Sequence, residues 1–272
     1  MALPRTQRAP IWFLAHGGPP TLYDRAHPAH QHWVRVGQEM AASALKGVVF
    51  VSAHWQAEPS EFPAAQGEAA KHVLLNVDER NPLVYDFHNF PAHYYTAQFA
   101  CTNPASLHRA VARHLEAQGY CVQPTERGID HGVWVPLLAA FGARMDIPLV
   151  QLSLPVPERT ARQDGAAALR LGKALRGLRD QGIAVIGGGQ PVHNLRDFML
   201  RRRHGAEAHA TGYGTTFPPA LTAALAAPCN GEQEERVAGQ DGDPVRWDAA
   251  KALFARPDYA QAHPTSEHLL RA

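Results

Sequence analysis

Histidine is the residue type that stands out in this sequence of 272 residues, because 16 of them are histidines. His16, His54 and His193 each follow a short apolar run and lie beside small residues. In an open α/β sheet, ligands bind beyond the carboxyl ends of the strands. Neutral imidazole suits Zn(II) and Fe(II), and such sites need three or four converging donors. A lone histidine is more often structural, but the three together favour a metal site.

Glycines and prolines lie close to these histidines in the sequence. Gly17–Pro20 comes directly after His16, and Gly187–Gly189 shortly precedes His193. Such residues let the backbone turn sharply, so that an imidazole can project into a cavity. The triple glycine is interpreted as a strand-to-helix turn. Phosphate binding is disfavoured, because the lysine of a P-loop and the spacing of a dinucleotide fingerprint are both missing.

An acidic residue and an imidazole stand together at Asp130 and His131, just before an apolar helical stretch. Asp130 could orient a histidine, or it could cap the N-terminus of that helix, and the sequence leaves both interpretations open. His131 could donate a hydrogen bond to a substrate or to bound oxygen.

Two further segments could contribute to a site. Tyr85–Pro91 is an aromatic, turn-rich loop that could line a pocket for a planar ligand or cover a satellite hydrophobic cluster. Near the end of the chain, Thr265 and Ser266 predict the start of a short helix. His268 would lie in its first turn and Glu267 would face elsewhere, although an exposed terminal histidine is the alternative.

Apolar runs alternate with helical patterns along the chain. Buried strands are predicted at 11–15, 47–51, 147–154 and 183–186, and helices at 32–45, 104–118, 157–180, 217–227 and 244–255. This alternation predicts a single-domain α/β sandwich with a mixed, mainly parallel central sheet and helices on both faces. Residues 200–243 are rich in glycine and proline and are expected to be loop-rich, with Arg201–Arg203 on a solvated surface.

The composition narrows the class of protein. Lysine and arginine number 26 against 25 acidic residues, and the net charge of +1 gives no electrostatic case for a nucleic-acid or membrane partner. No apolar run reaches the length of a signal peptide or a membrane span. Three cysteines without a close pair fit a reducing compartment. We therefore expect a cytoplasmic protein, and the oligomeric state stays open.

Seven motifs give this chain a resemblance to a known family. The chain resembles the class III extradiol ring-cleavage dioxygenases, and more narrowly their 4,5-DOPA dioxygenase-like branch. The motifs occur in the order of the family and span nearly the whole chain: His-Gly-Gly-Pro (16–19), Ser-Ala-His-Trp (52–55), Tyr-Asp-Phe-x-x-Phe-Pro (85–91), Asp-His-Gly-x-Trp-x-Pro-Leu (130–137), Val-Gln-Leu-Ser (150–153), Val-His-Asn-Leu (192–195) and Pro-x-x-Glu-His (264–268).

The resemblance implies a role for each histidine of these motifs. It makes His16, His54 and His268 the metal ligands, His193 the acid/base residue and His131 a catalytic residue of the active-site wall. Spacing alone favours His193 over His268 as the third metal ligand, whereas the resemblance assigns that role to His268 and the acid/base role to His193. It also implies one divalent metal ion per chain, with Fe(II) expected for activity and Zn(II) as an alternative.

The implied activity is cleavage of the ring of a catechol, DOPA-like or another small one, with insertion of both atoms of O2. A zinc-dependent hydrolase on the same histidines is a competing hypothesis. The motifs depart from the family at Gly18, where serine is common, and at His88 or Asn89, where glycine is usual. The family continues beyond the position of His268, so we expect one catalytic domain over 1–272, shortened at its C-terminus, or an inactive relative that binds metal weakly.

Overall fold

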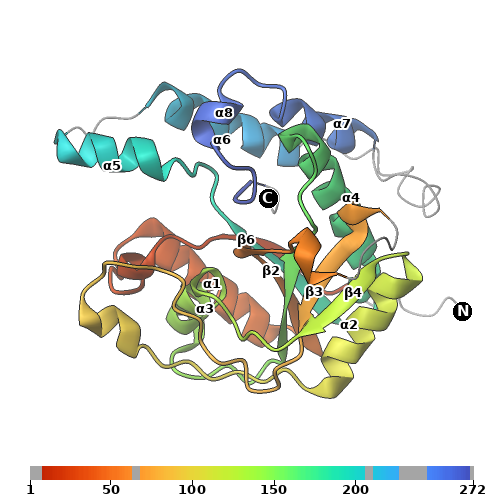
Figure 1. Cartoon of the computed structure of the whole chain (residues 1–272). Helices are drawn as coiled ribbons and strands as arrows, with labels where there is room; N and C mark the ends of the chain where they lie inside the picture. The colour runs from red at the N-terminus through yellow and green to blue at the C-terminus, as the bar shows by residue number, and fades with distance from the viewer. Residues whose placement is uncertain (1–7, 63–67, 206–210, 227–243, 270–272) are drawn as a thin grey trace, which may run out of the picture.

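A six-stranded sheet lies at the centre of the computed structural model, which describes residues 8–62, 68–205, 211–226 and 244–269 (Figure 1). Its strands, in the order β1-β6-β2-β5-β3-β4 across the sheet, are β1 (Ile11–Ala15), β2 (Gly47–Gln56), β3 (His72–Asn76), β4 (Cys121–Thr125), β5 (Leu149–Leu154) and β6 (Ile183–Gly189). Strands β1, β6, β2 and β5 pair in parallel, and β3 pairs antiparallel with β5 and parallel with β4. The mixed, mainly parallel sheet expected from the sequence is confirmed.

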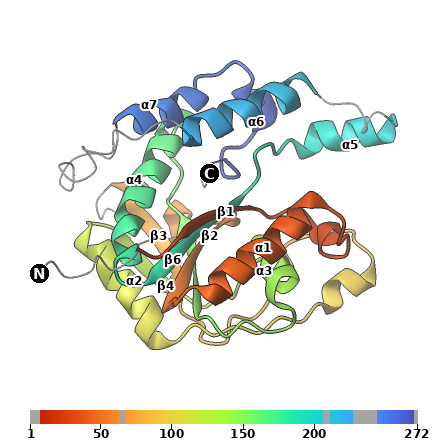
Figure 2. The same cartoon turned by 180° about the vertical axis from the view of Figure 1, so that it is seen from behind.

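Helices cover both faces of this sheet, as predicted (Figure 2). They are α1 (Pro28–Ala42), α2 (Ala105–Ala117), α3 (His131–Phe141), α4 (Ala161–Arg179), α5 (Leu195–Arg203), α6 (Gly212–Leu225), α7 (Pro244–Leu253) and α8 (Tyr259–Ala262). Four short 3₁₀ helices lie at Pro19–Leu22, Pro59–Glu61, Ala69–Lys71 and Ala92–Thr96.

The two faces follow from the alternation of side chains along each strand. Phe50 of β2 and Ile186 of β6 face α1 and α3, where Trp33 and Trp134 complete a core. The intervening Val49 and its neighbours face α2 and α4. Because both faces are covered, β2, β5 and β6 read as continuous apolar runs rather than as an alternating pattern.

A separate apolar cluster joins α6, α7 and α8 above α4 (Figure 1). Phe217 and Leu221 of α6 contribute to it, together with Leu253 of α7 and Tyr259 of α8. Leu269 also belongs to this cluster. The segment that carries His268 is therefore attached to a packed layer of its own.

The structure corrects several boundaries predicted from the sequence. Strands β3 and β4 were not predicted, because a buried five-residue run and a half-exposed strand containing proline carry little periodic signal. Helix α4 begins after Thr160, whose side chain accepts a hydrogen bond from Gln163 N, and not at Pro157. Within the expected loop-rich stretch 200–243, α6 occupies 212–225, whereas 206–210 and 227–243 lie outside the described residues.

Among the residues that the structure describes, no helix is both long enough and apolar enough to cross a lipid bilayer.

Candidate metal centre

The structure brings together the five histidines that the sequence singled out. His16 lies directly after β1, His54 lies near the end of β2, and His131 is the first residue of α3. His193 follows β6, and His268 lies in a turn after α8. The carboxyl ends of parallel strands meet at one edge of the sheet, and three of these imidazoles come from that edge.

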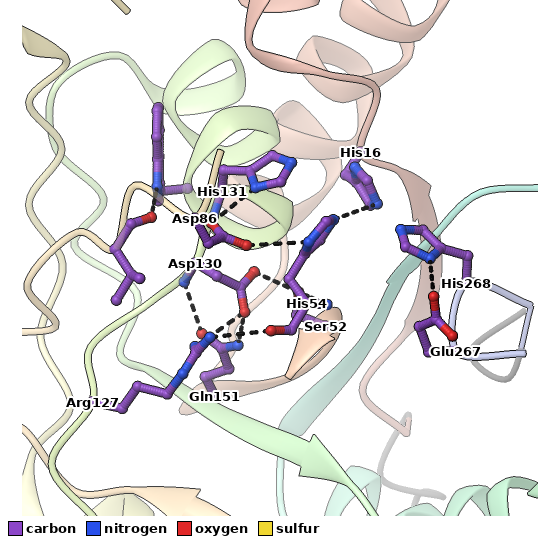
Figure 3. Close-up of polar contacts among 12 residues, drawn as sticks. His16, Ser52, His54, Asp86, Arg127, Asp130, His131, Gln151, Glu267 and His268 are labelled. Carbon is purple, nitrogen blue, oxygen red and sulfur yellow. Dashed lines mark hydrogen bonds and ion pairs between the residues drawn. The ribbon is translucent and has the colours of Figure 1, made fainter. Parts of the chain in front are cut away.

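Three of the imidazoles point nitrogen atoms toward a common region (Figure 3). The ring of His54 lies 4.8 Å from that of His16 and 5.1 Å from that of His268, measured between centroids. The Nε2 atoms of His16 and His54 are 3.3 Å apart. One nitrogen from each of the three residues lies within 4.8 Å of the others, so they could hold one metal ion.

The second ring nitrogen of each of these histidines faces an acceptor. His16 Nδ1 lies 2.7 Å from the carbonyl oxygen of Gly17. His54 Nδ1 lies 3.1 Å from Asp86 Oδ2, and His268 Nδ1 lies 3.1 Å from Glu267 Oε1. Because each acceptor requires a proton on Nδ1, a neutral ring keeps its lone pair on Nε2, the atom directed into the common region. Metal-binding histidines are held by carboxylates and carbonyls in this manner.

The polar atoms of the site fit a cation. His268 Nε2 is buried, and the described part of the chain offers it no hydrogen-bond partner. Burial lowers the pKa of His268 to about 3, and burial followed by the neighbouring histidines lowers the pKa of His16 well below its usual value. Both rings are therefore neutral near pH 7, which is the form that binds metal ions. A buried lone pair without a donor is destabilising, and a bound cation would satisfy it.

Backbone hydrogen bonds hold the segment of His268 against the end of β6. The N–H of Gln190 donates to the carbonyl of His268 at 3.0 Å, and the N–H of His193 donates to the carbonyl of Ala262 at 2.9 Å. His263 Nε2 donates to the carbonyl of Pro191 at 2.9 Å. His268 is only 3% exposed as a result. The interpretation of an exposed terminal histidine is therefore wrong.

The glycines before His193 belong to strand β6 and do not form the predicted turn. A Cβ atom added at Gly189 would lie 2.2 Å from the carbonyl oxygen of His268, and one at Gly188 would lie 2.4 Å from the Phe50 ring. The absence of side chains thus allows the His268 segment and a core aromatic ring to approach this strand closely.

The helix predicted to begin at Ser266 is not formed in the part of this segment that the structure describes, where residues 266–269 form a turn. Ser266 Oγ donates to Asp164 Oδ2 at 3.1 Å and does not cap a helix. Glu267 does not face elsewhere, because its carboxylate accepts hydrogen bonds from His268 and Thr265. Burial raises the pKa of Glu267, but these hydrogen bonds outweigh it and leave the pKa at about 2.

Asp130 neither orients one of the histidines nor caps α3 through its side chain. Its buried carboxylate accepts from Ser52 Oγ at 2.5 Å, from Gln151 Nε2 and from Arg127 at 3.2 Å (Figure 3). Arg127 also donates to the carbonyl of His54 at 3.1 Å. This polar network lies beneath β2 and supports the backbone that carries His54, which is a role that sequence reasoning missed.

Asp86 orients histidines of the site, which is one of the two roles that the sequence left open for Asp130. One of its carboxylate oxygens faces His54, and the other accepts from His131 through both the ring and the backbone N–H (Figure 3). Burial raises the pKa of Asp86, but the hydrogen bonds from His131 and then His54 lower it well below its usual range. The signal was present in the sequence, as an acidic residue between two aromatic residues, but the loop was interpreted only as a pocket wall or as the cover of a satellite hydrophobic cluster.

The aromatic loop 85–91 belongs to the main core and not to a satellite cluster. Phe87 is 7% exposed and packs against Trp134, and its ring centroid lies 5.5 Å from that of His131. Tyr85 donates to the carbonyl of Ala97 at 2.7 Å. These contacts fix the position of the loop and therefore of Asp86.

His193 lies beside the three converging imidazoles without sharing their arrangement. Its ring stacks on that of His268, with centroids 3.4 Å apart and planes inclined by 7°. Burial lowers the pKa of His193, an effect that Glu267 opposes only in part, and leaves it at about 4. A neutral imidazole at this position can accept a proton.

Comparisons with known proteins show which family the chain resembles. Residues 9–227 match the family of the catalytic LigB subunit of aromatic ring-opening dioxygenase. The chain is 29% identical to a 4,5-DOPA dioxygenase extradiol of Beta vulgaris over 94% of this chain and 82% of the relative. It is 31% identical to dioxygenase tasH of Hapsidospora irregularis, over 75% of this chain and 60% of that protein.

A bacterial relative and a solved structure extend the comparison. A 4,5-DOPA dioxygenase extradiol of Escherichia coli K12 is 30% identical over 70% of this chain and 62% of its own length. The fold matches a crystal structure of an uncharacterised protein from the same organism with a TM-score of 0.65 and 23% identity, covering 97% of this chain and 86% of the other. The resemblance predicted from the motifs is thus confirmed, and the chain belongs to the family of the LigB catalytic subunit, in the 4,5-DOPA dioxygenase-like branch of the class III extradiol dioxygenases.

Proposed function

We propose that this protein is a metal-dependent extradiol dioxygenase that opens the ring of a catechol and inserts both atoms of O2. Membership of the family supports a ring-opening dioxygenase. The observation that carries the metal dependence is the convergence of three Nε2 atoms, from His16, His54 and His268, whose Nδ1 atoms all face acceptors.

In this proposal, His16, His54 and His268 hold the ion. An all-imidazole set of neutral ligands suits both Fe(II) and Zn(II), and iron is the metal that we expect to support activity. When bound, the ion supplies Lewis-acid chemistry toward the hydroxyl groups of a catechol and redox chemistry toward O2. Glu267 and Asp86 balance part of its charge through the rings that they contact.

His193 is the proposed acid/base residue. Because burial holds its pKa at about 4, the ring is neutral at pH 7 and can accept a proton from a catechol hydroxyl group. The same ring can return the proton as the carbon–carbon bond beside the diol breaks. Both atoms of O2 remain in the ring-opened semialdehyde acid, so the reaction needs no external reductant. His131 lines the same site as a second polar contact for the substrate.

The substrate class in this proposal is a small catechol, DOPA-like or otherwise. Two relatives named for 4,5-DOPA support the DOPA-like choice. The family of ring-opening enzymes supports the aromatic diol in general.

Oxygen consumption is the measurement that tests this function. The protein would be reconstituted anaerobically with Fe(II), supplied with a panel of catechols, and compared with a zinc-loaded sample. We expect oxygen uptake and a yellow product in the iron form alone. Product formation from an ester or amide without oxygen uptake would instead indicate the zinc hydrolase.

The metal content of variants separates an active enzyme from an inactive relative. His268→Ala is expected to reduce the metal bound per chain, whereas His32→Ala provides a matched control, because His32 is exposed on α1. Equal metal content in both variants would mean that His268 does not contribute to the site.

A further inference from the structure

Asp86 lies on the loop that follows β3, yet its carboxylate contacts two of the site imidazoles. Asp86 Oδ2 lies 3.1 Å from His54 Nδ1, and Asp86 Oδ1 lies 2.9 Å from His131 Nδ1 (Figure 3). Asp86 Oδ1 also accepts from the backbone N–H of His131 at 2.9 Å. One side chain therefore joins a residue of β2 to the first residue of α3.

We propose that Asp86 is a positioning residue that fixes His54 and His131 together in the tautomer protonated at Nδ1. Both Nε2 lone pairs are then available within the site. This inference rests on the proposed function for its use of His54 as a metal ligand. The geometric claim concerns two hydrogen bonds that can be observed without turnover.

The carboxylate of Asp86 determines both tautomers. An ionised carboxylate only accepts hydrogen bonds, so each ring contacting it must carry its proton on the contacting nitrogen. A neutral imidazole has a single N–H, so its other nitrogen is left with a lone pair. His54 and His131 both contact Asp86 through Nδ1, so Nε2 carries the lone pair in each neutral ring.

The N-terminus of α3 stabilises the negative charge of Asp86. His131 is the first residue of that helix, and its backbone N–H points at the carboxylate. Unpaired N–H groups and the helix dipole favour an anion at this position. Three N–H groups thus occupy the carboxylate, which assigns Asp86 to positioning rather than to proton transfer.

The consequence for His131 is specific. With its proton held by Asp86, His131 presents an acceptor to the substrate, whereas the sequence suggested a donor. A hydroxyl group of a catechol could donate to His131 Nε2, but a substrate carbonyl could not accept from it. The site would therefore favour the protonated diol on entry, which is a selectivity that Asp86 confers through His131.

The tautomers can be measured in the unmodified protein. Long-range ¹H–¹⁵N spectra of the zinc-loaded, ¹⁵N-histidine-labelled protein would be assigned with single-histidine variants. We expect His131 to carry its proton on Nδ1 with Nε2 unprotonated, and His54 to carry a hydrogen-bonded Nδ1 proton. A proton on Nε2 of His131 would overturn the proposal.

Asp86→Asn provides the second test. The amide oxygen is expected to stay with the two N–H groups of His131, so the amide NH2 would face His54 and move the proton of that ring to Nε2. Zinc affinity should then fall by roughly 10- to 100-fold, as for other residues that orient metal-binding histidines. Competition with a chromophoric chelator measures this change, and circular dichroism monitors the fold.

The control is Asp146→Asn, which removes the same charge from a side chain that is 82% exposed. Wild-type affinity in Asp86→Asn would overturn the proposal. If that variant does not fold, the tautomers of the wild-type chain decide the question. A wild-type protein that binds zinc but consumes no oxygen in its iron form would contradict the proposed function and leave the result for Asp86 standing.

Discussion

Two kinds of histidine lie next to each other at the end of β6. His268 has its Nδ1 hydrogen-bonded to Glu267 and its Nε2 buried without a described partner, as a metal ligand requires. His193 stacks on that ring, and its lowered pKa keeps it neutral. At the scale of the residue, hydrogen-bond partners therefore distinguish the proposed ligand from the proposed base.

The first prediction concerns a proposed ligand. His16→Ala should lose metal binding, because two imidazoles remain where at least three donors are needed. Elemental analysis after dialysis against a metal buffer measures the metal bound per chain. His32→Ala, on the exposed side of α1, should retain the wild-type content. Full metal content in His16→Ala would remove His16 from the ligand set.

The second prediction concerns the proposed base. His193→Ala should keep its metal and lose turnover by about 10²- to 10⁴-fold, which is the usual contribution of general acid–base catalysis. Steady-state oxygen consumption and metal content would be measured on the same sample. Retained turnover would exclude the acid/base role, and loss of metal would instead make His193 a ligand.

At the scale of the element, β6 is the strand on which the site depends. It pairs with both β1 and β2, which carry His16 and His54 at or near their carboxyl ends. Just beyond it, backbone hydrogen bonds fix the segment 262–268. A shift of this strand end would displace several of the converging imidazoles together.

The third prediction tests the close approach of the His268 segment to Gly189 of β6. Gly189→Ala would place a Cβ atom 2.2 Å from the carbonyl oxygen of His268, so the segment must move. We expect weaker metal binding and a loss of about 1–3 kcal/mol of stability, as for other overpacked positions. Chelator competition and urea denaturation measure the two effects.

Gly172→Ala is the matched control for this substitution. Gly172 is exposed within α4, and a Cβ built there meets no described atom within 4 Å other than its chain neighbours and the nearby backbone of its own helix. Alanine favours a helix over glycine by about 1 kcal/mol, so the control should be as stable as the wild type or more stable. Equal metal affinity in the two variants would show that the segment tolerates displacement.

At the scale of the whole molecule, the site lies where the sheet meets the layer of α6, α7 and α8 (Figure 1). Burial there keeps several histidines neutral, and His263 adds another buried ring with a lowered pKa, caused first by desolvation. The unfolded chain must instead protonate these rings at their usual pKa of 6.5. Proton binding is therefore coupled to the stability of the entire fold.

The fourth prediction follows from this coupling. Between pH 6.5 and about 4, the unfolded state binds more protons than the folded state. The free energy of unfolding of the metal-free protein should therefore decrease as the pH is lowered through this range. Each such histidine contributes up to about 1.4 kcal/mol per pH unit. Urea denaturation at pH 5, 6 and 7 measures the slope. A flat profile would mean that these rings are protonated in the folded state.

The sequence predicted strands β1, β2, β5 and β6 and the main helices because buried parallel strands and amphipathic helices leave strong local patterns. It also located all five site histidines, through their positions after apolar runs and within family motifs. The partners of those histidines were missed, because Asp86 and Glu267 act through contacts that depend on tertiary structure. The role of Asp130 was missed for the same reason, because its partners Ser52 and Gln151 lie on strands β2 and β5, far from it in the sequence.

The strand order has a consequence for how the protein folds. Among the described strands, β1 forms an edge of the sheet and pairs only with β6, although β6 follows it much later in the chain. During synthesis, β1 and His16, which directly follows it, have no partner strand until residues 183–189 have been synthesised. Contacts over such long separations are slow to form. The candidate site therefore cannot assemble before β6 has been synthesised, because the strands that carry His16 and His54 both pair with it.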